Sequence, residues 1–319
     1  MVWIYGVSGL IILLFAGDAL VKGAVNLSLR AGIPAFVVSL TIVAFGTSAP
    51  ELLISVDAAL SGSSGIALGN VVGSNTANVL LVLGVPALMA VMHTSVCDTR
   101  KSYLQMLAAT FLFIALAWRG VFDWIAGIVM LAVLAYILGS AIRDGIRQRR
   151  DAATAAALDT AEEEPEGADP DMPSWKIGVF LGLGLIGLPL GADLLVDSAE
   201  VIARQFGVSE TAIGLSLVAL GTSLPELSTT VVAALRRQAD VALGNVIGSN
   251  LFNLLAIVGI AALIAPMPVP MSFLTLDLWV MLGASLLLIP FVYMSRDITR
   301  IWGVILSALY LGYIAMVLS

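Results

Sequence analysis

Ten apolar segments, each long enough or nearly long enough to cross a bilayer, divide this chain. A spanning helix needs about 20 predominantly apolar residues. Hydrophobic residues make up 60% of the 319 and charged residues only 12%, whereas a soluble domain has roughly a quarter of its residues charged. We therefore predict an all-α integral membrane protein with ten transmembrane helices, near 2–28, 34–60, 66–92, 102–118, 121–142, 175–203, 209–235, 240–265, 273–294 and 300–318.

Basic residues indicate how these spans are oriented, because loops on the cytoplasmic side carry an excess of lysine and arginine. If the N-terminus lies outside, the outer side keeps only Arg119 and Arg204. The sequence therefore predicts a cell-membrane protein, plasma or inner, with the linker 143–174 in the cytoplasm. The other 13 basic residues then lie at inner loops and helix ends: Lys22, Arg30, Arg100, Lys101, Arg143, Arg147, Arg149, Arg150, Lys176, Arg236, Arg237, Arg296 and Arg300.

The chain also repeats itself at a shift of 175 residues. Asp18–Gly84 and Asp193–Gly259 align without a gap and share 29 identities in 67 positions. Because each copy belongs to a five-helix half, the second half enters the membrane from the opposite side. Such inverted repeats are typical of secondary transporters. We expect a first five-helix repeat at 1–142, an acidic linker at 143–174 and a second five-helix repeat at 175–319.

The strongest identity within the repeat falls on polar residues that packing alone would not require. "AFGTSAPEL" at 44–52 matches "ALGTSLPEL" at 219–227, and each stretch places a glutamate, Glu51 or Glu226, inside an apolar segment. A charged residue near the bilayer centre is costly and is kept mainly where it faces a partner or a water-filled cavity. Two such carboxylates must share protons or bind cations.

Further oxygen atoms surround each glutamate in the sequence. Pro50 and Pro225 should break their helices and free backbone carbonyls at Gly46 and Gly221. "ALGNVVGSN" at 67–75 matches "ALGNVIGSN" at 242–250 in the next segment of each half. A set made of carboxylate, hydroxyl, amide and carbonyl oxygens suits calcium or sodium. The side chains in this set are Thr47, Ser48, Glu51, Ser74 and Asn78, with Thr222, Ser223, Glu226, Ser249 and Asn253. For Asn75 and Asn250, a structural bond to the broken helices and an ion contact both remain open.

At these residues the sequence resembles the sodium/calcium exchanger family of the cation/calcium antiporter superfamily. "GTSxPE" and "GNxxGSNxxN" match its two signature repeats, and the resemblance covers nearly the whole chain, including the ten-helix layout and the inverted halves. The resemblance implies clustered cation sites at mid-membrane, with the ten side chains above and the carbonyls of Ala44 and Ala219 as ligands. It also implies sodium–calcium antiport, in which the first and sixth helices slide across the other eight.

The neutral Asn253 stands where some relatives carry aspartate, so we expect no potassium requirement. The linker 151–174 is acidic and too short for the folded calcium-sensing domains of animal exchangers. We expect calcium and sodium as the transported ions, the lipid bilayer as the surroundings, a monomeric state, and neither a cofactor nor a nucleic-acid partner.

Three other functions remain open at this point. A calcium/proton antiporter could use the same glutamates to release protons, and a channel could also contain inverted repeats with interrupted helices. An intramembrane hydrolase using Ser48 would need a nearby base, but the only histidine, His93, lies in a predicted loop. The sequence therefore favours a transporter over an enzyme.

Overall fold

Helices dominate the computed structural model, which describes residues 2–155, 169, 171–206 and 219–318. The first part of the chain contains α1 (Val2–Ala31), α2 (Ala35–Val38), the π-helix η1 (Ser39–Val43), α3 (Ala44–Thr47), α4 (Ala49–Leu60), α5 (Ser64–Leu80), α6 (Gly84–Met89), the 3-10 helix η2 (Thr94–Val96), α7 (Arg100–Ala117), β1 (Val121–Phe122) and α8 (Trp124–Ala155). The second part contains α9 (Ser174–Gln205), α11 (Ala219–Thr222), α12 (Leu224–Leu235), α13 (Ala239–Leu251), the π-helix η5 (Phe252–Ile257), α14 (Val258–Ile264), β2 (Met267–Pro268), the π-helix η6 (Phe273–Asp277), α15 (Leu278–Leu286), α16 (Ile289–Tyr293) and α17 (Arg300–Leu318).

The described helices confirm the membrane character of the chain. Seven helical stretches are long and apolar enough to span a bilayer, and the pair Ala35–Thr47 and Ala49–Leu60, bent by 46°, would make an eighth. Two other predicted spans correspond to α7, of 18 residues, and to α12, of 12 residues. The part of the predicted span 209–235 that precedes Ala219 lies outside the described residues, as does most of the acidic linker.

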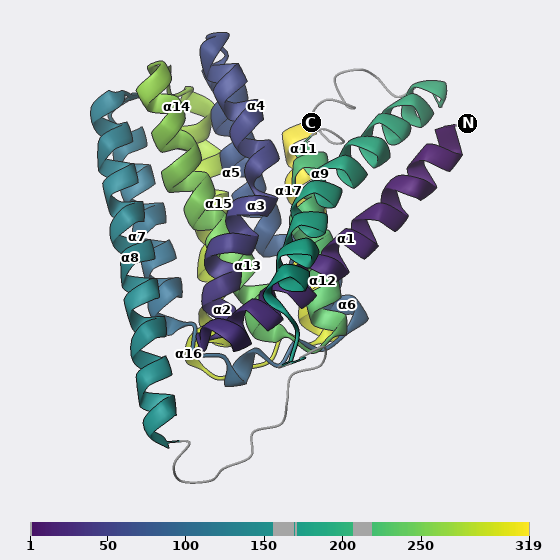
Figure 1. Ribbon diagram of the computed structural model, residues 1–319. Helices are drawn as coiled ribbons and strands as arrows, with labels where there is room; N and C mark the ends of the chain where they lie inside the picture. Colours follow the sequence, from purple (N-terminus) through teal and green to yellow (C-terminus); the bar gives the residue numbers. More distant parts are fainter. Residues whose placement is uncertain (1, 156–168, 170, 207–218, 319) are drawn as a thin grey trace.

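Two long antiparallel helices, α1 and α9, form a pair that leans away from the other helices (Figure 1). Glycines allow this close contact, because a Cβ atom added at Gly184 would lie 2.5 Å from the Leu20 Cβ, and one at Gly9 would lie 2.8 Å from the Gly191 carbonyl oxygen. Leucine and alanine side chains of the pair form a second hydrophobic cluster, which Val38 of α2 and Val43 of η1 complete. Small residues at such positions are the usual basis of close helix packing in membranes.

The predicted helix breaks are present in both halves. Ser48 separates α3 from α4 with φ −83° and ψ 8°, and Ser223 separates α11 from α12 with φ −86° and ψ 1°. Pro50 and Pro225 lie in the first turn of the helix that follows, where proline is tolerated because its missing N–H has no helical partner. The breaks therefore fall two residues before each proline, and each glutamate lies in the first turn of a new helix.

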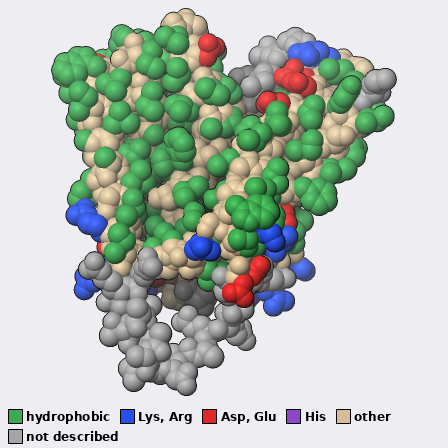
Figure 2. Space-filling model, viewed as in Figure 1, with side chains coloured by type: hydrophobic (Ala, Val, Ile, Leu, Met, Phe, Trp, Pro, Cys, Tyr) green, Lys and Arg blue, Asp and Glu red, His purple; other side chains and the backbone are tan. Residues whose placement is uncertain are grey.

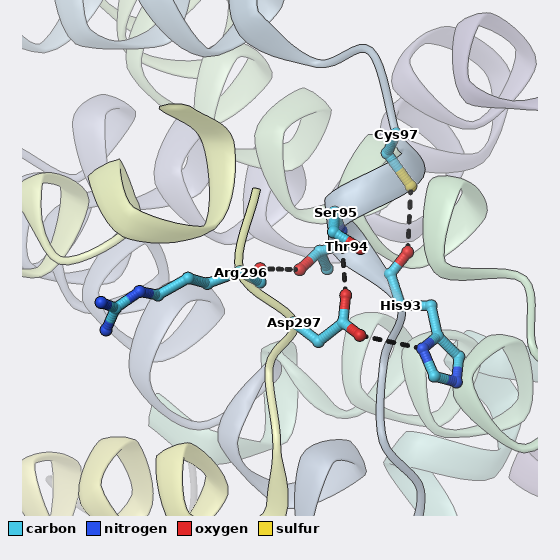
Figure 3. A network of polar contacts seen from close by, with 6 residues as sticks. All are labelled: His93, Thr94, Ser95, Cys97, Arg296 and Asp297. Atoms are coloured by element: carbon cyan, nitrogen blue, oxygen red, sulfur yellow. Dashed lines mark hydrogen bonds and ion pairs between the residues drawn. The ribbon is translucent and has the colours of Figure 1, made fainter. Parts of the chain in front are cut away.

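Polar contacts join the two halves at one end of the molecule. The His93 Nδ1 lies 3.0 Å from the Asp297 Oδ2, the Ser95 N–H donates to the Asp297 Oδ1 at 3.1 Å, and the Thr94 hydroxyl donates to the Arg296 carbonyl at 2.8 Å (Figure 3). Burial alone would raise the pKa of Asp297, but the hydrogen bonds from Ser95 and His93 hold it below its ordinary value. Met92 and Ile298 pair as an isolated β-bridge beside this network.

An ionic contact at the same end connects α1 to the end of α12. Arg236 donates its Nε–H to the Asp18 Oδ1 at 2.7 Å, and the Lys22 Nζ lies 3.0 Å from the Asp18 Oδ2. Most of the lysine and arginine side chains visible in Figure 2 lie toward this end, while hydrophobic side chains cover the flanks. At the opposite end, β1 and β2 pair antiparallel and join the loops before α8 and after α14.

Candidate cation site

The two glutamates lie at the centre of the candidate site. Glu51 is in the first turn of α4 and Glu226 in the first turn of α12, and both side chains are completely buried. Neither carboxylate forms an ion pair with a described lysine, arginine or histidine. The partial positive charge of each helix N-terminus favours a negative group there. That partial charge does not replace the counter-charge that two buried carboxylates require.

Their hydrogen-bond partners are unequal. The Glu226 Oε1 accepts bonds from the Ser48 hydroxyl at 3.1 Å and from the Ser249 hydroxyl at 3.4 Å. The Glu226 Oε2, both carboxylate oxygens of Glu51 and the Ser223 hydroxyl have no hydrogen-bond partner among the described residues. Because Ser48 belongs to the first half and Glu226 to the second, the partnered carboxylate also connects the two halves.

The amide side chains predicted as ligands also present unpartnered atoms. Asn78 donates its Nδ2–H to the Asn250 Oδ1 at 3.1 Å, but its own Oδ1 has no partner in the described part of the chain. Asn253 lies in the π-helix η5, is fully buried, and has no described partner for either side-chain polar atom. A buried polar group without a partner costs roughly 1–3 kcal/mol, so these atoms point to a ligand that is present during function.

The contacts of Asn75 and Asn250 answer only part of the question that the sequence left open for them. Asn75 donates to the Asn250 carbonyl oxygen at 3.3 Å, and the Asn250 Nδ2 lies 3.7 Å from the Met106 Sδ. Within the described residues these bonds join α5, α13 and α7. None of these bonds reaches the broken helices, and the Asn75 Oδ1 has no partner among the described residues.

Hydrogen bonds bring several other predicted ligands together around Thr47. Its hydroxyl lies 3.3 Å from the Ala44 carbonyl oxygen and 3.5 Å from the Ser249 hydroxyl. The Ala44 carbonyl also accepts the Ser48 N–H at 3.1 Å, which leaves less of its capacity for an ion than a free carbonyl would have. Ser74 is buried on α5 and Thr222 is buried at the end of α11. Ala219 begins α11, and its side chain lies outside the description.

The sequence interpretation missed two asparagines, Asn70 and Asn245. Asn70 donates to the Glu51 carbonyl oxygen at 3.1 Å, and Asn245 donates to the Glu226 carbonyl oxygen at 3.3 Å. Both residues stand at the same place in the repeated "GNVxGSN" motif. Their identity in both copies was the signal that could have pointed to them.

The arrangement suits a hard cation. Its buried atoms are carboxylate, hydroxyl, amide and carbonyl oxygens, the ligands that calcium and sodium prefer. No group of three or more histidine, cysteine, aspartate or glutamate side chains gathers among the described residues.

Comparison with known proteins agrees with a site for hard cations. The family model described as "Sodium/calcium exchanger protein" matches residues 1–142 and 176–319. The sodium/calcium exchanger MaX1 of Methanosarcina acetivorans is 33% identical over 338 residues, covering 97% of this chain and 96% of the relative. The inner membrane protein YrbG of Escherichia coli is 33% identical over 315 residues, covering 97% of this chain and 94% of the relative.

A solved structure also matches nearly the whole fold. The sodium-calcium exchanger NCX_Mj, soaked with 2.5 mM Na⁺ and 0.1 mM Ca²⁺, superposes with a TM-score of 0.80 at 33% identity and covers 98% of this chain and 96% of that one. The family of this chain is one of transporters, as the sequence interpretation expected. The chain is an integral membrane protein that belongs to the sodium/calcium exchanger family.

Proposed function

We propose that this protein is a secondary active antiporter that exchanges sodium for calcium by alternating access, without a potassium requirement. The observation that carries the proposal is the pair of fully buried glutamates, Glu51 and Glu226, which the repeat places symmetrically and which form no ion pair with a described lysine, arginine or histidine. Two fixed charges of this kind make an empty site costly to move across the membrane. A calcium ion, or more than one sodium ion, supplies the missing charge.

The proposed ligands are the twelve residues expected from the sequence. The unpartnered, buried polar atoms of Glu51, Asn78, Ser223, Glu226 and Asn253 support five of them directly. Neutral Asn253 supports the absence of a potassium requirement, because the site then holds two carboxylates. The other proposed ligands are Ala44, Thr47, Ser48, Ser74, Ala219, Thr222 and Ser249.

The proposed architecture has ten spans in two inverted five-helix repeats, with the N-terminus outside and the linker 143–174 in the cytoplasm. The matching breaks at Ser48 and Ser223 support the repeat. The α1–α9 pair, which leans away from the other helices in Figure 1, supports movement of that pair against them. Lysine and arginine side chains at the linker end in Figure 2 support the orientation.

Transport in reconstituted vesicles tests the proposal. Vesicles loaded with sodium and diluted into sodium-free buffer should take up external calcium, and collapse of the sodium gradient should stop uptake. Added potassium should not change the rate. Uptake that ignores sodium and follows an imposed pH gradient would identify a calcium/proton antiporter, and uptake with no counter-ion gradient would identify a channel.

A matched pair of variants connects the activity to the site. Glu51→Gln removes the buried charge of α4, whereas Asp57→Asn removes an exposed charge six residues further along the same helix. Uptake should be lost in the first variant and kept in the second. Equal uptake by both variants would contradict the site.

A further inference from the structure

Two asparagines that are not among the proposed ligands connect the two halves at the cation site. Asn70 lies on α5 and Asn245 on α13, each 19 residues after the glutamate of its own half. Asn245 is completely buried. Both occupy equivalent places in the repeat, so any function they share is built into the chain twice.

Each side-chain amide makes the same pair of bonds within its own half. The Asn70 Nδ2 donates to the Glu51 carbonyl oxygen at 3.1 Å and to the Ser55 hydroxyl at 2.9 Å. The Asn245 Nδ2 donates to the Glu226 carbonyl oxygen at 3.3 Å and to the Thr230 hydroxyl at 3.1 Å. Both amide protons are therefore used to hold the first turn of the helix that carries the glutamate.

The amide oxygen of each asparagine faces the opposite half. The Thr47 hydroxyl lies 3.3 Å from the Asn245 Oδ1, and the Thr222 hydroxyl lies 3.5 Å from the Asn70 Oδ1. With its two protons directed to acceptors in its own half, the amide can only accept at this oxygen. Thr47 and Thr222 must then be the donors in these contacts.

This direction matters for a hydroxyl that binds a cation. A hydroxyl oxygen coordinates a cation through a lone pair, so its proton must point elsewhere, to an acceptor. The other acceptors of the threonine protons are the Ala44 carbonyl oxygen, 3.3 Å from the Thr47 hydroxyl, the Glu226 carboxylate beside Thr47 and the Glu51 carboxylate beside Thr222. All three are themselves proposed ligands. The asparagine oxygen is an acceptor that leaves the proposed ligands free.

From this geometry we infer that Asn70 and Asn245 are positioning residues that couple each glutamate to the threonine of the opposite half. The inference rests on the proposed cation site. Each asparagine fixes the main chain of one carboxylate and turns the hydroxyl lone pairs of one threonine toward the ion. The contacts cross between halves, with Asn245 acting on Thr47 and Asn70 acting on Thr222.

The crossed pattern can be tested by double-mutant cycles on calcium uptake, with KM and kcat measured separately in the full-length protein. Asn245→Ala and Thr47→Val should each raise the calcium KM about tenfold, as expected for one lost hydrogen bond at a charged ligand site. In the Asn245→Ala background, Thr47→Val should raise KM by less than about twofold further, because the contact is already absent. Thr222→Val, the same-half partner, should keep its full effect there.

The mirror cycle applies to Asn70. Thr222→Val should lose its effect in the Asn70→Ala background, whereas Thr47→Val should keep it. Asn26→Ala removes a buried amide near the inner end of α1, away from the site, and should leave the calcium KM unchanged. The inference would be overturned if the changes in calcium KM were additive in all four double mutants. It would also be overturned if the variants lowered only kcat, because a smaller amount of folded protein would explain that result.

Two further measures keep the test conclusive when a variant does not fold or when the counter-ion is not sodium. If an alanine variant fails to fold, Asn245→Ser and Asn70→Ser serve in the same cycles, and the calcium-induced rise in Tm replaces uptake as the measure of affinity. The cycles also do not depend on the counter-ion. Proton-driven uptake with crossed coupling would overturn sodium exchange and leave the inference standing, whereas sodium-driven uptake without crossed coupling would overturn the inference alone.

Discussion

Glu51 and Glu226 occupy the same place in two copies of one motif, yet their surroundings differ. Glu226 accepts hydrogen bonds from Ser48 and Ser249, whereas both oxygens of Glu51 and its potential donor Ser223 lack a described partner. The difference shows that a sequence repeat specifies equal chemistry in the two halves but not equal contacts. In this structure the Glu226 carboxylate connects the halves through Ser48, and no matching bond joins Ser223 to Glu51.

The largest expected effect is the loss of calcium uptake when either glutamate loses its charge. In this respect we expect the two carboxylates to behave alike. Glu51→Gln and Glu226→Gln should each abolish calcium uptake, because each leaves one negative charge where calcium requires two. Initial rates in sodium-loaded vesicles check this, with Asp57→Asn as control. Transport at the normal rate by either variant would show that only one half binds the ion.

Gly248→Ala should have the next largest effect, because α13 of the second half packs directly on the broken helix of the first. A Cβ atom there would lie 2.4 Å from the Leu40 carbonyl oxygen and 2.6 Å from the Ala44 Cβ. Overpacking of this kind costs about 1–3 kcal/mol and would displace Ser48 from Glu226. Thermal unfolding in detergent measures the loss.

The control for that substitution is Gly139→Ala on α8, where a Cβ atom would meet no described atom within 4 Å. Its Tm should stay the same or rise slightly, because alanine favours helices by roughly 1 kcal/mol over glycine. A similar loss of Tm in both variants would mean that close contact between α13 and η1 is not needed for the fold.

The unequal hydroxyls give a smaller and more specific effect. Without ions, Ser48→Ala should lower stability by about 1 kcal/mol, because it removes a hydrogen bond to a buried carboxylate. Ser223→Ala should be nearly neutral, because its hydroxyl has no described partner. Tm values in sodium-free buffer with a calcium chelator check the difference. Equal shifts in the two variants would show that the asymmetry does not exist in solution.

The smallest effect is expected far from the site, where Asp297 joins the two halves at their ends. Its ionised form stabilises the fold above the unfolded pKa of about 3.9, and this contribution is lost as the pH falls through the lower folded pKa. Asp297→Asn should therefore cost less than about 1 kcal/mol at neutral pH and nothing in strong acid. The calcium KM should not change, and a changed KM would show that this loop contact reaches the site.

Much of the fold follows from sequence pattern. Apolar length predicts the long helices, and Pro50 and Pro225 predict the breaks. The ion pair of Asp18 with Arg236 could not be predicted in the same way, because it joins residues 218 positions apart. The π-helical turn Phe252–Ile257, which carries Asn253, also lies inside a stretch that the sequence predicts as one continuous span over 240–265.

The candidate site shows the same limit. The motif identifies which residues carry oxygen atoms, so the glutamates, serines and asparagines were predicted from sequence. It could not show that Ser48 bonds to Glu226 while Ser223 does not bond to Glu51, because the two copies have identical residues there. Asn70 and Asn245 were missed because their role lies in contacts to main-chain atoms and to the opposite half.

Direct location of a bound cation tests the central claim most clearly. Strontium can replace calcium as a heavier ion, and anomalous diffraction from crystals soaked in strontium without sodium would show its position. We predict one strong peak within bonding distance of both the Glu51 and the Glu226 carboxylates, and loss of that peak in Glu51→Gln. A strong peak away from these two carboxylates, or one that survives in Glu51→Gln, would contradict the account.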